Sequence, residues 1–141
     1  MIRLKALVAG VLVLIGTNFV TGALFLFAYS AFAGVQLVRV VDAASTKSWA
    51  GVIVFGSVLG SQFAGGYVAG RVAGSRELRH GLGTGLIVAV IWFLVASGQE
   101  LPFGAIAWMT FLWMAVPSLG ALAARQRRLA QQQGAGELSG S

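Results

Sequence analysis

Side chains able to do chemistry are few in this sequence of 141 residues, and they do not gather into a reactive set. Its single histidine, His80, lies three residues after Glu77, and one His–Glu pair makes neither a metal site nor a catalytic triad. The absence of cysteine excludes thiolate nucleophiles, thiolate metal ligands and disulfides. The sequence therefore predicts a protein that is not an enzyme and that needs no cofactor and no metal ion.

Three uncharged polar residues stand inside long apolar segments: Asn18, Gln62 and Thr110. Along a helix, Asn18 is about 20 Å from Lys5 and Gln62 is about 13 Å from Arg71, which places both amides near the middle of a membrane. An unpaired amide is costly there, so we expect the two to pair with each other or with the backbone. The functional alternative is a polar contact for a permeating ion or substrate. Because no acidic or basic residue accompanies them, a proton- or cation-coupled carrier is disfavoured.

The composition indicates which elements must position these residues. With 57% hydrophobic residues, 10% charged residues and a mean hydropathy of +0.85, the chain is too apolar for a soluble domain. Charged residues divide it into four uncharged stretches, at 6–38, 48–70, 81–99 and 101–124. A helix needs roughly 20 residues to cross the hydrocarbon core of a bilayer. The sequence therefore predicts an all-α polytopic membrane protein with four transmembrane helices, at about 7–31, 48–70, 81–99 and 103–124.

Two parts of the chain fall outside this simple pattern. Stretch 6–38 is too long for one upright helix and too short for two, so we expect a short interfacial segment at 35–45 after the first helix. A secretory signal peptide is the alternative for the N-terminus, but the apolar run exceeds its core of roughly 7–15 residues, so an uncleaved helix is expected. Residues 125–141 are basic and then polar and glycine-rich, which predicts a disordered cytoplasmic tail after a single domain of residues 1–124.

The basic residues predict the orientation. If both termini are cytoplasmic, eight of the ten lysines and arginines lie on the inner side and two on the outer side. The inner set is Arg3, Lys5, Arg71, Arg76, Arg79, Arg125, Arg127 and Arg128, and the outer set is Arg39 and Lys47. We therefore expect cytoplasmic termini and a cytoplasmic loop near 71–80. The net charge of +6 lies at the ends of apolar runs, which favours contact with anionic lipid over nucleic acid.

Arg71, Arg76 and Arg79 are close together in the expected cytoplasmic loop. Guanidinium groups bind phosphate through charge-assisted hydrogen bonds, so these three are candidates for binding anionic lipid head groups. As plain determinants of topology they need no ligand. The two roles are compatible, and the sequence predicts the lipid bilayer as a partner in either case.

Small residues recur every four positions on segment 48–70 and just beyond it, which is the pattern of a glycine zipper. One row is Ser57, Ser61, Gly65, Ala69 and Ala73, and the next contains Gly66, Gly70 and Gly74. The third segment begins with a similar row that contains Gly81 and Gly85. Small faces let helix backbones approach closely in lipid, so we expect these residues to pack a central second helix against the third. The alternative is that glycine is merely common in membrane helices.

The run "GGYVAGRVAGSRELRHGLGTGL", residues 65–86, carries a family resemblance. It resembles the junction of helices 2 and 3 in small four-span bacterial membrane proteins of uncharacterised function, in which a GG-aromatic-x-small-G-basic segment leads through a polar turn into HG or NG. The resemblance implies the same four-helix fold and a location in a bacterial inner membrane. It brings no catalytic residues.

These observations favour a function that depends on contact between helices. We expect a scaffold or accessory subunit that packs against another membrane protein or against itself, because no catalytic set or intramembrane charge indicates another role. The alternative is a small oligomeric pore or carrier, with a polar path near Asn18, Gln62 and Thr110.

Overall fold

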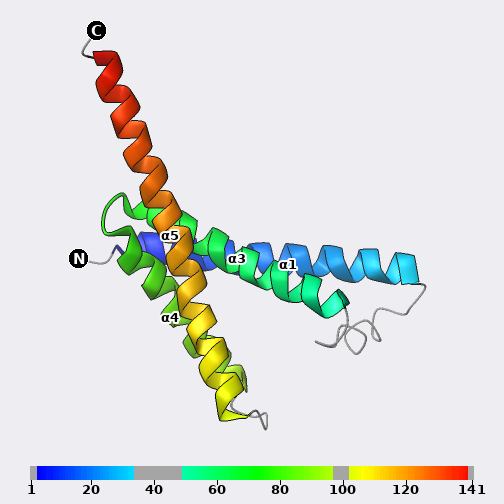
Figure 1. Ribbon diagram of the computed structural model, residues 1–141. Coiled ribbons are helices and arrows are strands. Elements are labelled where there is room, and N and C mark those ends of the chain that lie inside the picture. The colour runs from blue at the N-terminus through cyan, green and yellow to red at the C-terminus, as the bar shows by residue number, and fades with distance from the viewer. Residues whose placement is uncertain (1–2, 34–48, 97–101, 140–141) are drawn as a thin grey trace.

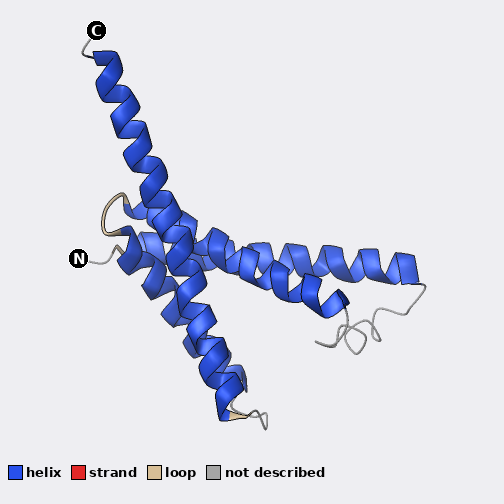
Figure 2. Cartoon of the chain, viewed as in Figure 1, coloured by secondary structure: helices blue, strands red, loops and turns tan. Residues whose placement is uncertain are grey.

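The computed structural model describes residues 3–33, 49–96 and 102–139, and the regular elements in these ranges are helices (Figure 2). They are α1 (Leu4–Ala33), α3 (Trp49–Ala73), α4 (Glu77–Ala96) and α5 (Phe103–Ser139). Each is long and apolar enough to cross a membrane. The prediction of an all-α protein with four such helices is confirmed. The interfacial segment expected at 35–45 lies outside the described residues.

The helices form two antiparallel pairs that diverge from a common end (Figure 1). One pair is α1 with α3 and the other is α4 with α5, while α3 also packs on α5 and α4 where the pairs meet. The common end contains the start of α1, the turn between α3 and α4, and the middle of α5. We call this region, residues 3–10, 65–85 and 113–124, the junction. Away from the junction, the two pairs separate from each other.

Buried apolar residues at the junction are mostly small. Ala6, Ala69, Ala73, Ala121 and Ala124 are each at most 1% exposed, whereas large apolar side chains such as Phe19 and Phe27 are 77% and 67% exposed. A soluble protein would bury the large side chains and gain stability from the hydrophobic effect. In lipid that gain is absent, and small residues instead let backbones approach closely. The distribution of side-chain size is therefore that of a protein surrounded by lipid.

The turn between α3 and α4 is shorter than the sequence predicts. It comprises residues 74–76 only, because both helices continue past the ends of their apolar segments. Gly74 has a φ of 64°, the left-handed conformation that commonly ends a helix, and no atom lies within 4 Å of where its Cβ would be. The prediction that Gly74 packs against a neighbouring helix is therefore wrong. Its role is to end α3.

The prediction of a disordered tail is also wrong for the described residues, because α5 continues as a helix to Ser139. All nine residues from Arg125 to Gln133 are alanine, leucine, glutamine or arginine, which favour the helix. Two side-chain contacts with α3 hold this extension at its base. Arg127 Nη1 lies 3.3 Å from the Tyr67 hydroxyl, and Arg71 Nη1 lies 3.4 Å from Gln131 Oε1.

Candidate functional site

The closest approach of two helices is the crossing of α3 and α5. A Cβ added to Gly66 would overlap the backbone of Pro117, and a Cβ added to Gly120 would overlap the carbonyl oxygen of Phe63. The two helices therefore touch backbone to backbone at two points, one glycine from each helix. Such contact gains dispersion energy and allows weak Cα–H···O bonds, which a side chain would prevent.

α1 meets α3 at a second glycine contact. A Cβ on Gly65 would lie 2.7 Å from the carbonyl oxygen of Gly10, and a Cβ on Gly10 would lie 2.7 Å from the Cβ of Ala69 and 3.0 Å from Thr84 Oγ1. The row that contains Gly65 and Ala69 thus faces α1, whereas the row that contains Gly66 faces α5. The two small rows of α3 serve two different neighbours.

The two glycines of α4 that were predicted to pack, Gly81 and Gly85, have their nearest neighbours on α5. A Cβ on Gly81 would lie 2.6 Å from the Cβ of Ala121, and one on Gly85 would lie 2.6 Å from the carbonyl oxygen of Trp113. Pro117 has no N–H, so the carbonyl of Trp113 lacks its usual helical donor, and it points at the bare backbone of Gly85. The expected meeting of the α3 and α4 rows is wrong, because the middle of α5 occupies that place.

Other members of the predicted rows have simpler surroundings. Gly70 would bring a Cβ within 3.1 Å of Ala121 Cα and Ala124 Cβ, and Ala73 is fully buried. Ser61 is buried and donates to the carbonyl of Ser57, while half-buried Ser57 donates to the carbonyl of Ile53. Both hydroxyl groups therefore donate their hydrogen bonds to backbone carbonyls of α3 itself.

The sequence analysis did not identify Gly10 or Gly120 as contact residues. On α5 a signal existed, since Pro117, Ala121 and Ala124 follow one another at helical spacing beside Gly120. On α1 the three glycines, Gly10, Gly16 and Gly22, are six residues apart and form no row at helical spacing, so they carry no such signal. Several other glycines show why glycine alone is insufficient: within the described ranges, no neighbouring side chain or helix comes within 4 Å of a Cβ at Gly16, Gly22, Gly56, Gly60 or Gly104.

His80 is a structural polar centre of the junction, a role that the sequence analysis missed. It is 1% exposed and lies inside the first turns of α4. Its Nε2 accepts a hydrogen bond from the backbone N–H of Arg3 at 2.9 Å, and its Nδ1 lies 3.1 Å from the carbonyl oxygen of Arg76. An accepting Nε2 assigns the proton to Nδ1, which then donates to Arg76. The neutral ring therefore joins the start of α1 to the start of α4.

The three intramembrane polar residues do not form one path. Thr110 donates its hydroxyl to the carbonyl of Ile106 within α5. Gln62 is 1% exposed, and its Oε1 has no hydrogen-bond partner within the described ranges. Asn18 lies elsewhere, in a cleft between the two helix pairs that neither Gln62 nor Thr110 lines.

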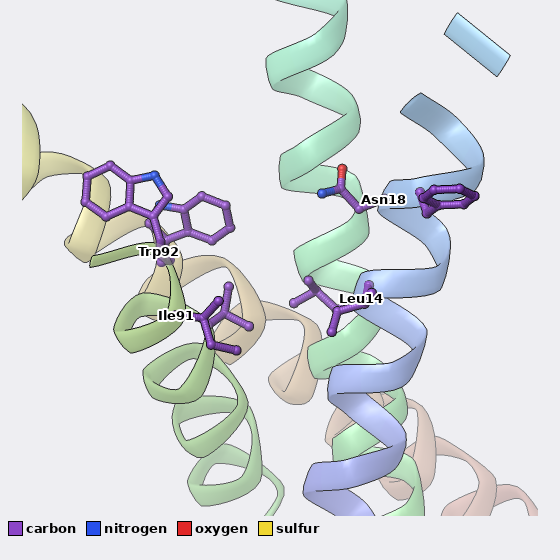
Figure 3. A pocket seen from close by; sticks show the side chains of 8 residues that line it. Leu14, Asn18, Ile91 and Trp92 are labelled. Carbon is purple, nitrogen blue, oxygen red and sulfur yellow. The ribbon is translucent and has the colours of Figure 1, made fainter. Parts of the chain in front are cut away.

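This inter-hairpin cleft has a volume of about 380 Å³ (Figure 3). Its walls include Leu14, Ile15 and Asn18 of α1, Ile91 and Trp92 of α4, and Trp113 of α5. The rings of Trp92 and Trp113 stack at 6.4 Å, and the Asn18 amide extends from α1 toward the side on which Trp92 lies. Trp113 Nε1 is a buried donor with no hydrogen-bond partner among residues 3–33, 49–96 and 102–139. The cleft thus combines mostly apolar walls with one amide side chain, that of Asn18.

A second cavity, also about 380 Å³, lies at the junction and is polar. We call it the arginine pocket because Arg76, Arg79, Arg125 and Arg128 line it, together with Glu77 and Leu78. Of the three arginines predicted to contact lipid head groups, Arg76 and Arg79 belong to this pocket. Arg71 does not, since it contacts Gln131 on the tail of α5.

Comparison with protein families, with curated proteins and with solved structures gives no match. The resemblance of residues 65–86 to small four-span bacterial membrane proteins therefore stays a prediction. Among the described residues, no three histidine, aspartate or glutamate side chains come close enough to hold a metal ion.

Proposed function

We propose that the protein is a non-catalytic scaffold or accessory subunit of a membrane assembly, and that its inter-hairpin cleft receives a transmembrane helix of another subunit. In this proposal the junction lies at the cytoplasmic face of a bacterial inner membrane, with both termini in the cytoplasm. The basic residues Arg3, Arg76, Arg79 and Arg125 lie at or beside the junction, as the positive-inside rule requires.

The observation that carries the proposal is the Asn18 amide, which lies on the wall of an otherwise apolar cleft between the two helix pairs. An amide in apolar surroundings is stabilised by a partner that supplies a hydrogen-bond donor or acceptor. The acyl chain of a lipid has no acceptor at this depth. A partner helix can supply a serine, threonine or asparagine oxygen, or a backbone carbonyl that lacks its helical donor. The amide of Asn18 offers both a donor and an acceptor to such a helix.

The rigid junction supports the same function. Backbone contacts at Gly66, Gly120 and Gly65 leave no space for the helices to rotate against one another at that end. The two helix pairs are therefore held apart at the other end, with large apolar side chains exposed on both. A fixed opening with apolar walls suits a protein that holds a partner in place.

Filling the cleft is expected to release the partner. Ile91 lines the cleft and Val90, one residue earlier, does not; their exposures of 47% and 51% are similar. In Ile91→Trp the indole occupies the space meant for the visiting helix, whereas in Val90→Trp it points to lipid. Tagged protein purified from native membranes in mild detergent should lose a stoichiometric membrane partner, by about tenfold or more, in Ile91→Trp only.

Other outcomes of this experiment would contradict the proposal. If both tryptophan variants retain the same companions as the native protein, the cleft is not the binding surface. If the mass in detergent shows only copies of this chain, and that assembly leaks ions from liposomes, the pore or carrier alternative is favoured instead. In that case Asn18 is the described polar residue that lines the opening between the helix pairs.

The proposed orientation has a separate test. The chain contains no cysteine, so one introduced thiol reports its own side of the membrane. Ser75 lies in the exposed turn between α3 and α4. A Ser75→Cys protein in intact cells should resist a membrane-impermeant maleimide and react after the cells are opened. Labelling in intact cells would place the junction outside and reverse the orientation.

A further inference from the structure

We propose that the arginine pocket binds a dianionic phosphate group, either the phosphate of a lipid head group or a free phosphate compound. The inference is independent of the scaffold proposal, because it concerns a different cavity and the protein alone. Arg76 approaches the cavity from the turn just before α4, Arg79 approaches it from α4, and Arg125 and Arg128 approach it from α5. Two helices that are about 50 residues apart in the sequence thus bring four guanidinium groups to one cavity of about 380 Å³.

The pocket has more positive charge than its own residues can balance. Glu77 is its acidic member, and four arginines against one glutamate leave an excess of three positive charges. Glu77 is 4% exposed and already committed to Arg128, with its Oε1 2.6 Å from Arg128 Nη2. Like charges that share a cavity repel one another, so the arrangement is stabilised when an anion enters.

Hydrogen-bond donors are also in excess. The contact between Arg128 and Glu77 is an ion pair by distance, but its geometry is not that of an aligned hydrogen bond, and Arg128 Nε is buried without a hydrogen-bond partner in the described structure. A guanidinium has five N–H donors and no acceptor. Arg76, Arg79 and Arg125 are exposed at the pocket, where their donors are available to a ligand. Two parallel N–H donors of a guanidinium group bind two oxygens of one phosphate or one carboxylate group.

The backbone adds to this preference. The pocket contains the first turn of α4, which carries the positive end of the helix dipole, and of its amides that of Arg79 already donates to the Arg76 carbonyl. Arg76, which precedes α4, has a φ of 53°. A glycine would adopt this left-handed conformation with less strain, so the arginine side chain is retained at a conformational cost. Because Arg76 lines the arginine pocket, its guanidinium group gives a reason for an arginine at this strained position.

The choice of phosphate source follows from the test. We suggest purified full-length protein in nanodiscs of phosphatidylcholine alone or with added phosphatidic acid, and native mass spectrometry to count bound lipid. Phosphatidic acid should stay bound when the nanodisc is exchanged for detergent, while phosphatidylcholine should not. Addition of inorganic phosphate separates the two sources, because it displaces the lipid only if the pocket accepts a free phosphate group.

Matched variants locate the site. Arg79→Gln and Arg125→Gln each remove one pocket arginine that is exposed, so both proteins should fold with unchanged thermal stability. Each should weaken phosphatidic acid binding by about tenfold or more, the loss typical of one hydrogen bond to a charged group. The control Arg71→Gln removes the same charge at the same end of the protein but outside the pocket, and it should change binding less than about twofold.

Two results would overturn the inference. Equal weakening by all three variants would show that net charge attracts the lipid and that no built site exists. Equal retention of phosphatidic acid and phosphatidylcholine by the native protein, with no effect of inorganic phosphate, would show that the pocket does not bind phosphate at all.

Discussion

Replacing Gly66 by alanine is expected to lower the stability of the protein by about 3 kcal/mol, the upper end for overpacking a well-packed contact. The added methyl group would overlap the backbone of Pro117. A flexible side chain could move aside, but a helical backbone can yield only if α3 and α5 separate along their length. Separation would also disrupt the contact between Gly120 and Phe63, which lies three residues along each helix from the contact between Pro117 and Gly66. Thermal unfolding in detergent, followed by circular dichroism, should show a midpoint lower by roughly 10 °C.

The matched control for this prediction is Gly60→Ala. Gly60 lies on the same helix, but no atom is within 4 Å of its Cβ position. Alanine favours the helix over glycine by about 0.5 to 1 kcal/mol, so this variant should be as stable as the native protein or slightly more stable. If Gly66→Ala and Gly60→Ala unfold at the same temperature, backbone contact at the α3–α5 crossing is not what holds the two helix pairs together.

The comparison of these two glycines shows what the sequence can and cannot predict about such a fold. A row of small residues on α3 is visible from spacing alone, and so is the need for a close neighbour. Which neighbour it meets is decided by the arrangement of all four helices. The sequence predicts that the small row of α3 packs against Gly81 and Gly85 of α4. In the structure Gly66 and Gly70 of α3 instead meet Pro117 and Ala121 of α5. Spacing within one helix contains no information on that choice.

The helix ends show a related limit. Charged residues mark where an apolar segment stops, and this marker correctly predicted the number of helices in the described ranges that are long and apolar enough to cross a membrane. It does not mark where the helix stops, because a helix can continue into water if its residues favour helical structure. α4 therefore begins at Glu77, four residues before its predicted start at 81, and α5 continues to Ser139. These extensions bring Arg79, Arg125 and Arg128 onto helices and so create the arginine pocket.

His80 is the clearest case of a residue whose role depends on distant contacts. Its partner Arg3 is 77 residues away in the sequence, and no local pattern links them. The prediction treated His80 as a loop residue, since a charged or polar residue between two apolar segments is usually solvated. The structure instead buries it, and burial of a polar ring is tolerated because both of its nitrogens have partners.

His80→Leu is expected to destabilise the junction by about 1 to 3 kcal/mol, because the Arg3 amide loses its acceptor. Leucine has nearly the volume of histidine, so the loss comes from the hydrogen bonds and not from a cavity. The Arg3 amide loses its acceptor, whereas the Arg76 carbonyl still accepts a hydrogen bond from the Arg79 amide at 3.0 Å. Thermal unfolding in detergent measures the total effect, and hydrogen exchange of the amides of residues 3–7 measures the local one.

A second substitution separates the hydrogen bonds from the shape of the side chain. Glutamine offers one acceptor and two donors, so His80→Gln can restore a bond to the Arg3 amide and one to the Arg76 carbonyl, although with a more flexible chain. We expect it to recover about half of the stability that leucine loses and to slow exchange at the start of α1 again. If leucine and glutamine destabilise equally, the ring acts by packing alone. If the Arg3 amide exchanges no faster in His80→Leu than in the native protein, the bond between Arg3 and His80 does not hold α1 at the junction, and the helix pairs are joined there by the glycine contacts alone.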